Sequence, residues 1–355
     1  MDIYVVIMAG GVGSRFWPRS KEKTPKQLLK IFGDETLIQQ TVNRVKGLVS
    51  EKNIFVITNK VQKEKVIEQL PQIPSENIIA EPFGKNTAPC IGLSAVLIKE
   101  KSKDAVIITL PADHYIQDEK EFRRTIKTAA KFAYSSGGLV TIGINPTKPE
   151  TGYGYIQVDD TVEGEEIYRV TTFAEKPNFS TAKRFMSSGD FMWNSGMFIW
   201  RADVILNEID KYLLDLSDGL KELEKSVGKS NFEKSLSKVY GQLKSISIDY
   251  GVMEKSPNVF LVKGNFAWSD VGSWDAVYDL SEKDEDGNAL VGDVYAEGSH
   301  NSFIYSKKKF TAAVGVDNII VIDTDDALLV CNRNNAQDVK DLVDYLKLHN
   351  RTDLL

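Results

Sequence analysis

The stretch that decides the fold is IYVVIMAGGVGSRFWPRSKEKTPKQLL, residues 3–29. It begins with a continuous apolar run over 3–8 and then reaches Gly10, Gly11 and Gly13. An apolar run of this kind predicts a strand that is buried on both faces, as in a parallel sheet covered by helices. Glycines after such a strand let backbone N–H groups approach phosphate oxygens closely. The stretch therefore predicts a strand followed by a phosphate-binding loop.

Two familiar phosphate-binding loops do not fit the letters of this stretch. A dinucleotide-binding loop needs the pattern G-x-G-x-x-G, but Phe16 stands where the third glycine would follow Gly11 and Gly13. A P-loop ends in Gly-Lys-Ser or Gly-Lys-Thr, and the stretch has neither. Taken alone, the stretch also fits a tight turn with incidental basic residues.

The first part of the chain repeats the order of strand and helix. Further buried strands are predicted at 53–58, 105–110 and 138–144. Between them, apolar residues recur at helical spacing over 37–48 and 122–133. This alternation predicts an α/β fold with a parallel sheet and helices on both faces. Ligands of such sheets bind beyond the carboxyl ends of the strands, so the loops there should carry the chemistry.

Two later segments have a different residue composition. Residues 203–245 are charged, poor in strand formers and helical in pattern, which predicts a helical insertion. This insertion either packs on the flank of the sheet or contributes to the substrate pocket. A polar run that ends in glycine, at 281–287, predicts a domain boundary.

The C-terminal region is predicted to be a small β unit followed by a helix. Short β-branched runs separated by polar turns fill 303–331, and they fit either the coils of a short β-helix or a small sandwich. An amphipathic helix is predicted over 336–350. The residues that share its apolar face are Val339, Leu342, Val343 and Leu346.

The overall composition excludes several classes of protein. The 355 residues carry a net charge of −6, which argues against a broad nucleic-acid-binding surface. Cys90 and Cys331 are the two cysteines of the sequence, so no disulfide framework is expected. The N-terminal apolar run is too short for a signal peptide, and no run approaches the length of a membrane span. We expect a cytoplasmic protein that binds neither nucleic acid nor membrane.

The full pattern of the opening stretch is G-G-x-G-S-R-F-W-P-R-S followed by P-K-Q. This pattern resembles the signature of the sugar-phosphate nucleotidyltransferases, and Phe16-Trp17-Pro18 looks like the mannose-1-phosphate guanylyltransferase branch of that family. Further motifs agree in order along nearly the whole chain. They are EPFGKNTAP (81–89), PADH (111–114), TGYGYI (151–156), FAEKP (173–177), NSGMF (194–198), SIDYGVME (247–254) and WSDVGSW (268–274).

The resemblance implies a fold, a reaction and partners. The fold would be a Rossmann-like mixed, mainly parallel sheet of the nucleotide-diphospho-sugar transferase type, with a small left-handed β-helix domain and a terminal helix. Residues 1–285 would form the catalytic domain and 286–355 a dimerisation unit, so we expect a homodimer. The reaction would convert GTP and mannose 1-phosphate into GDP-mannose and pyrophosphate. The sugar phosphate would attack the α-phosphorus in line, assisted by one or more Mg²⁺ ions and without a covalent enzyme intermediate.

The resemblance also assigns catalytic and nucleotide-binding residues. Arg15 would hold the departing phosphates, and Lys26 would place a point charge near the α-phosphate. Asp113 and Asp270 would hold Mg²⁺, which prefers carboxylates together with phosphate oxygens. The loops that bind the nucleotide would use Ala9, Gly10, Gly11, Gly13, Ser14, Asn86, Pro89 and Asp113.

The sugar phosphate would be held by a second group of residues. Lys176 would bind its phosphate and Glu175 would accept its hydroxyls. The remaining residues assigned to this group are Gly152, Tyr153, Asn194 and Asp249. For His114 we expect a structural or hydrogen-bonding role, because a phosphate nucleophile needs no general base.

Two other functions remain open from the sequence. The first is a nucleotidyltransferase that uses another sugar 1-phosphate or nucleotide. The second is a regulatory subunit that binds nucleotide sugars without turnover. Such a subunit would be expected to lack a phosphate-binding cation or a metal-binding carboxylate, yet all the candidates are present.

Overall fold

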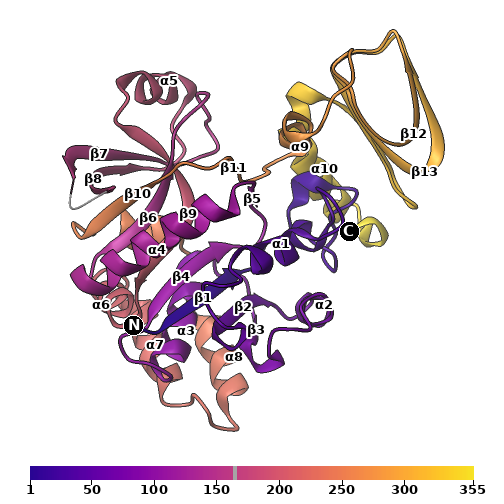
Figure 1. The fold of residues 1–355 in the computed structure, drawn as a ribbon. Helices are drawn as coiled ribbons and strands as arrows, with labels where there is room; N and C mark the ends of the chain where they lie inside the picture. Colours follow the sequence, from indigo (N-terminus) through magenta and orange to yellow (C-terminus); the bar gives the residue numbers. More distant parts are fainter. Residues whose placement is uncertain (163–165) are drawn as a thin grey trace.

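The computed structural model describes residues 1–162 and 166–355. Within these ranges a nine-stranded sheet has the order β3-β2-β1-β4-β9-β6-β10-β8-β7 (Figure 1). Its strands are β1 (Ile3–Met8), β2 (Ile54–Asn59), β3 (Ile78–Glu81), β4 (Val106–Pro111), β6 (Leu139–Ile144), β7 (Tyr155–Val162), β8 (Ile167–Ala174), β9 (Phe191–Arg201) and β10 (Val259–Gly264). The four strands predicted from apolar runs are confirmed as β1, β2, β4 and β6, to within a residue or two at their ends.

The sheet is mixed, as expected. Strands β3, β2, β1 and β4 are parallel to one another, and β10 is parallel to β6. Strand β9 lies between β4 and β6 and is antiparallel to both. Strands β7 and β8 form a further antiparallel pair, which extends the sheet beyond β10. Apolar runs buried on both faces predict strands but do not fix their direction, because direction depends on the distant partner strand.

Helices cover both faces of the sheet (Figure 1). The helices are α1 (Leu37–Arg44), α2 (Lys63–Gln69), α3 (Thr87–Lys99), α4 (Glu119–Ser136), α5 (Phe179–Ser188), α6 (Ala202–Tyr212), α7 (Leu214–Glu224), α8 (Phe232–Gln242), α9 (Trp274–Leu280) and α10 (Val339–Leu348). Alternate residues of β1 enter two separate cores. Val5 and Ile7 pack with residues of α1, α2 and α4, whereas Tyr4 and Val6 pack with residues of α3 and α6. The resulting three layers leave the carboxyl ends of the parallel strands open for ligand.

The predicted insertion at 203–245 forms α6, α7 and α8, which pack beside α3 on one face of the sheet. A side chain at Gly92 of α3 would lie 2.5 Å from a methyl of Leu220 on α7, so the two helices approach closely. The insertion therefore packs on the flank of the sheet, which was one of the two alternatives predicted from the sequence. Tyr240 of α8 nevertheless reaches Glu81 at the end of β3.

The C-terminal region forms a separate four-stranded sheet. Its strands are β12 (Ala289–Glu297), β13 (Phe303–Val314), β14 (Ile319–Asp323) and β15 (Leu328–Asn332), in that order across the sheet. Strands β12, β13 and β14 are parallel, and β15 is antiparallel to β14. The predicted helix at 336–350 is shorter than expected, because residues 333–338 form tighter 3₁₀ turns before α10 begins at Val339.

An aromatic core joins this region to the opening loop. Phe16 and Trp17 are buried against Trp274 and against residues of β13, β14 and α10. The Trp274 indole donates to the Trp17 carbonyl oxygen over 3.1 Å, and the Trp17 indole donates to the Leu354 carbonyl oxygen over 3.0 Å. The C-terminal region is therefore packed directly behind the glycine-rich loop.

The predicted helix over 37–48 ends earlier than expected, since α1 stops at Arg44. Within the described ranges, no helix is long and apolar enough to cross a membrane.

Candidate active site

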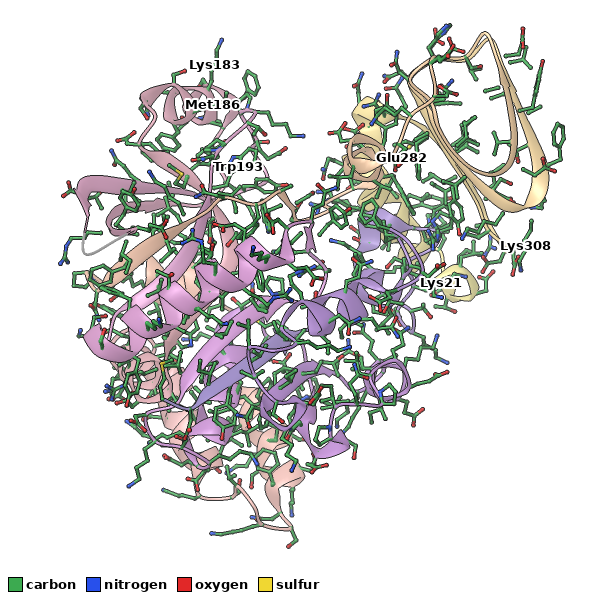
Figure 2. All side chains as sticks on the ribbon, in the orientation of Figure 1. Lys21, Lys183, Met186, Trp193, Glu282 and Lys308 are labelled. Atoms are coloured by element: carbon green, nitrogen blue, oxygen red, sulfur yellow. The ribbon has the colours of Figure 1, made fainter. Side chains whose placement is uncertain are left out.

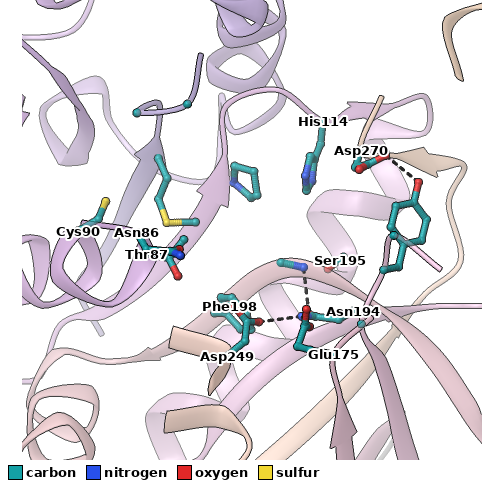
Figure 3. Close-up of a pocket in the computed structure, with 18 of the residues that line it drawn as sticks. Asn86, Thr87, Cys90, His114, Glu175, Asn194, Ser195, Phe198, Asp249 and Asp270 are labelled. Carbon is teal, nitrogen blue, oxygen red and sulfur yellow. Dashed lines mark hydrogen bonds between the residues drawn. The ribbon is translucent and has the colours of Figure 1, made fainter. Parts of the chain in front are cut away.

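A pocket opens at the carboxyl ends of β1, β3 and β4, between the sheet and the loops that follow these strands (Figure 3). Many of the residues predicted from the sequence line it. They are Gly10, Gly11, Asn86, Gly152, Tyr153, Glu175, Asn194, Asp249 and Asp270. They come from separate segments of the chain, and the fold brings them to one edge of the sheet.

The glycine-rich loop is shaped by close contact with Lys26. Gly13 has φ 72°, a left-handed conformation that favours glycine. A Cβ atom at Gly13 would lie 2.6 Å from Lys26 Cβ. The Lys26 amide also donates to the Val12 carbonyl oxygen over 3.3 Å. Gly10 and Gly11 thus face the pocket while Gly13 and Ser14 lie on the other side of the loop, against the C-terminal region.

Lys26 links the two predicted metal carboxylates. Its ammonium pairs with Asp113 at 2.9 Å and donates to the backbone carbonyl of Asp270. Burial is the largest single influence on Asp113 and raises its pKa, but the charge and hydrogen bond of Lys26, with smaller contributions from His114 and a backbone hydrogen bond, together lower the pKa below its ordinary value. The Asp270 carboxylate accepts a hydrogen bond from the Tyr153 hydroxyl over 2.7 Å. A buried cation therefore lies between two carboxylate-bearing loops.

A short antiparallel pairing holds these two loops together. Strand β5 (Tyr115–Ile116) follows Asp113, and strand β11 (Trp268–Ser269) precedes Asp270. The two strands pair with each other outside the main sheet. Asp113 and Asp270 are thus neighbours in space because each lies next to one strand of this pair.

His114, next to Asp113, is fixed by a neighbouring aromatic side chain. The Trp268 indole donates to His114 Nδ1 over 3.2 Å, and the two rings are perpendicular, at 86°. Burial lowers the pKa of His114 to about 4, against the attraction of Asp113 and Asp270. The imidazole is therefore neutral at physiological pH.

At the other end of the pocket, Asn194 joins two carboxyl groups. Its amide group donates to Glu175 over 3.3 Å and to Asp249 over 2.9 Å, while its oxygen accepts from the Gly196 amide (Figure 3). Burial, reinforced by Asp249, raises the pKa of Glu175 to about 7, and burial also raises the pKa of Asp249. This end is suited to hydroxyl groups, which can donate to carboxylates and accept from an amide.

Glycine is required beside Glu175 for a steric reason. A Cβ atom at Gly154 would lie 2.0 Å from the Glu175 carboxylate oxygen. Any larger residue at this position would displace the carboxylate, so the second glycine of the TGYGYI motif fixes the shape of this end.

The structure places other predicted residues outside the pocket lining. Ala9 and Pro89 are buried beneath it. Arg15 and Lys176 are exposed, and neither lines the pocket. Lys176 is nevertheless near enough to Glu175 and Asp249 for its charge to lower the pKa of both carboxyl groups, against the larger effect of burial.

Glu81 was missed at the level of sequence, although the EPFGKNTAP motif begins with it. It ends β3, is 5% exposed and lines the pocket beside Gly10. Its carboxylate accepts a hydrogen bond from the Tyr240 hydroxyl over 3.0 Å. Burial raises the pKa of Glu81 to about 7, and the Tyr240 bond acts against this rise. A carboxyl group at the carboxyl end of a parallel strand was the signal that could have identified it.

Asn86 faces the pocket, but its side-chain oxygen has a local role. It caps α3 by accepting from the Thr87 amide over 2.8 Å. The amide nitrogen of Asn86 has no hydrogen-bond partner among the residues that the structure describes, so it is available to a ligand.

Known families and proteins match the chain over nearly its whole length. A family model described as "Nucleotidyl transferase" matches residues 4–287, and one described as "MannoseP isomerase/GMP-like beta-helix domain" matches 294–346. The chain is 42% identical to mannose-1-phosphate guanylyltransferase RfbM of Salmonella typhimurium, over 99% of this chain and 74% of the relative. It is also 42% identical to a mannose-1-phosphate guanylyltransferase of Klebsiella pneumoniae, over 98% of this chain and 74% of the relative.

A solved structure is also similar to this chain over nearly its whole length. It is a crystal structure from Thermus thermophilus described as a mannose-1-phosphate geranyltransferase. The TM-score is 0.88 at 33% identity, and the similarity covers 98% of this chain and all of the other.

Proposed function

The chain belongs to the nucleotidyl transferase family, and we propose that its pocket converts GTP and mannose 1-phosphate into GDP-mannose and pyrophosphate. The observation that carries the proposal is the chemical division of the pocket. Asp270 lines one end, where Lys26 joins its loop to that of Asp113, and an amide with two carboxyl groups lines the other. The first end suits phosphates, and the second suits a sugar.

The reaction requires one bond to form and one to break. An oxygen of the sugar phosphate bonds to the α-phosphorus, and the bond from that phosphorus to the pyrophosphate oxygen breaks on the opposite side. The attacking oxygen is already deprotonated, so no side chain has to remove a proton. The main obstacle is repulsion between two anions, which positioning and local positive charge reduce.

The opening loop supplies much of that positive potential. Gly10 and Gly11 offer backbone N–H groups to the triphosphate, and Lys26 places its ammonium near the α-phosphorus. Arg15, whose side chain is exposed, would turn toward the leaving pyrophosphate and bind it with its planar guanidinium.

The two aspartates fit a magnesium site. Asp270 lines the pocket, and Lys26 joins its loop to that of Asp113, so the two carboxylates belong to neighbouring loops. The chemistry of Mg²⁺ favours one or two carboxylates with phosphate oxygens and water. Asp113 and Asp270 would hold the ion, which when bound neutralises phosphate charge. Tyr153 orients the Asp270 carboxylate through its hydroxyl.

The sugar would lie against the amide and its two carboxyl groups. Glu175 and Asp249 accept hydrogen bonds from sugar hydroxyls, while Asn194 keeps both carboxyl groups in place. Lys176 binds the phosphate of the sugar. The backbone around Gly152 borders the same space.

Glu81 and Asn86 would read the base. Guanine presents two adjacent donors, N1–H and the 2-amino group, and a carboxylate accepts both. Adenine and the pyrimidines do not present this pair of donors. A buried carboxylate left without them is poorly solvated, and this discriminates strongly against the wrong base. The Asn86 amide is placed to donate to the guanine carbonyl oxygen.

We also propose that the protein is a cytoplasmic homodimer formed through the C-terminal unit, with the left-handed β-helix that the resemblance implies. Two exposed apolar side chains, Leu328 and Val330, lie on β15, which is an edge strand. Exposed apolar edge strands are favourable sites for pairing with a second copy.

The experiment that tests the function measures pyrophosphate release from a matrix of nucleotides and sugar 1-phosphates with Mg²⁺. We expect the highest rate with GTP and mannose 1-phosphate, and a rate reduced by orders of magnitude in Lys26→Ala. A higher rate with another pair would overturn the substrate assignment. Binding of GDP-mannose without turnover would overturn catalysis and favour a regulatory subunit.

A further inference from the structure

His114 lies in the loop between β4 and β5 and points into the pocket, on the side of Asp270 (Figure 3). Its backbone is fixed, because the Arg44 guanidinium donates to the His114 carbonyl oxygen over 3.2 Å. Its ring is fixed by the Trp268 indole at Nδ1. The other ring nitrogen, Nε2, has no hydrogen-bond partner within 1–162 and 166–355.

The bond from Trp268 determines which nitrogen carries the proton. An indole N–H can only donate, so Nδ1 must use its lone pair to accept. An imidazolium ion carries protons on both nitrogens and could not accept this bond. The ring is therefore neutral, and its single proton lies on Nε2.

We propose that His114 donates its Nε2–H to a phosphate oxygen of the bound substrates. This inference rests on the proposed function, because it assumes that phosphates occupy this end of the pocket. In the same state the imidazole has no free lone pair, so His114 is neither a metal ligand nor a general base. Trp268 is a positioning residue that selects this state.

The residues beside the ring favour this role. Asp113 directly precedes His114 in the chain, and Asp270 lines the same pocket. A free imidazole lone pair beside the two carboxylates would compete with them for a metal ion. A neutral N–H avoids that competition and still contributes a hydrogen bond to an anionic oxygen, which is stronger than one to a neutral acceptor.

The first test is nitrogen NMR of the full chain labelled at histidine. The sequence has three histidines, and the His114→Gln variant identifies the signal that is lost. We expect an unprotonated Nδ1 and a protonated Nε2 at neutral pH without any metal. An imidazolium or an Nδ1–H tautomer would overturn the proposal. In Trp268→Phe, which lacks the indole N–H, we expect the two neutral tautomers of His114 to be populated more equally.

Ligand addition in the same experiment identifies the acceptor. Inorganic pyrophosphate and GDP-mannose should both shift Nε2, whereas free mannose should not. A shift with mannose alone would transfer the contact to a sugar hydroxyl and overturn the phosphate assignment. This readout needs no turnover, so it can fail or succeed independently of the proposed reaction.

Kinetics of matched variants provide the second test. The amide nitrogen of glutamine lies near the position of Nε2, so His114→Gln should keep kcat within about 5-fold of wild type. His114→Leu should lower kcat about 10- to 100-fold, as expected for the loss of a hydrogen bond to a charged group. The control is His349→Gln, at the exposed end of α10. Equal losses in the Gln and Leu variants would overturn the donor role.

Discussion

The carboxyl group of Glu175 binds its proton more tightly than an exposed carboxyl group does. Burial and Asp249 raise its pKa from 4.5 to about 7, so the folded chain binds this proton more tightly than the unfolded chain does. Between these two pH values the folded state holds more protons, and its stability therefore falls as pH rises through the window. Hydroxyls of a bound sugar would reverse the effect by donating to the ionised carboxylate.

A variant without the charge should lose this pH dependence. Glu175→Gln should melt at a higher temperature than wild type at about pH 8 and at nearly the same temperature at about pH 5, without ligand. Thermal unfolding at both pH values measures the difference, with exposed Glu282→Gln as the control. The same temperature gap at both pH values would contradict the proposed protonation of Glu175.

The base end of the pocket offers a second test at a single residue. Inosine triphosphate lacks the 2-amino group of GTP, so a carboxylate at Glu81 should favour GTP. Glu81→Gln should reduce the ratio of kcat/KM for the two nucleotides by about 10-fold, the value of roughly one hydrogen bond. Glu175→Gln, at the sugar end, should leave this ratio unchanged. An unchanged ratio in Glu81→Gln would place base recognition elsewhere.

The motifs predict which residue types lie at the two ends of the pocket. They do not predict which side chains form hydrogen bonds with those residues. Asp113, Asp270 and Asn194 belong to motifs quoted from the sequence. Asp270 and Asn194 line the pocket, and Asp113 pairs with Lys26. The bond between Tyr240 and Glu81 joins residues 159 positions apart, in segments with no shared motif. Only the packing of α8 against the sheet could reveal it.

At the scale of elements, an aromatic link connects the opening loop with α9 and the C-terminal unit. The Phe16 and Trp274 rings lie 4.9 Å apart, and Trp274 also stacks on Phe303 at 5.9 Å. Trp274 follows Asp270 closely in the WSDVGSW motif, so this link positions a predicted metal carboxylate as well as the loop.

Removing the link should destabilise the protein and reduce catalysis together. Trp274→Ala should cost about 3–5 kcal/mol of unfolding free energy, because it leaves a large cavity in a fully buried site. Urea unfolding measures this cost, and Trp274→Phe should lose less because part of the ring contact remains. Phe179→Ala, at a position 61% exposed, should change stability by less than about 0.5 kcal/mol. A similar small change in Trp274→Ala would show that the link is not structural.

At the scale of the whole molecule, the C-terminal sheet extends away from the catalytic sheet (Figure 1), and side chains such as Lys308 point from it into solvent (Figure 2). The unit is anchored to the rest of the chain by the aromatic core and by an ion pair between Lys21 and Asp326. Exposed apolar residues of its strands, such as Leu328 and Val330, lie outside that aromatic core.

The proposed dimer leads to a prediction about association. Replacing Leu328 and Val330 together by lysine should convert a dimer to a monomer in analytical ultracentrifugation at micromolar concentration. Neither residue lines the pocket, so pyrophosphate release per chain should persist. A wild-type monomer would contradict the proposal outright, and a dimer that survives the double substitution would move the interface to another surface.

The sequence by itself determined the family, the reaction class, most of the strands and helices, and the residue types of the two ends of the pocket. These features depend on local order along the chain, where apolar period and motif spacing carry the information. The tertiary structure decided the direction of β9, the role of α8 beside Glu81, and the state of His114. Each depends on contacts between distant segments: Trp268 lies 154 residues from His114, and the Asp270 carbonyl lies 244 residues from Lys26. Local propensity cannot specify such pairs, because they are fixed only when the whole core packs.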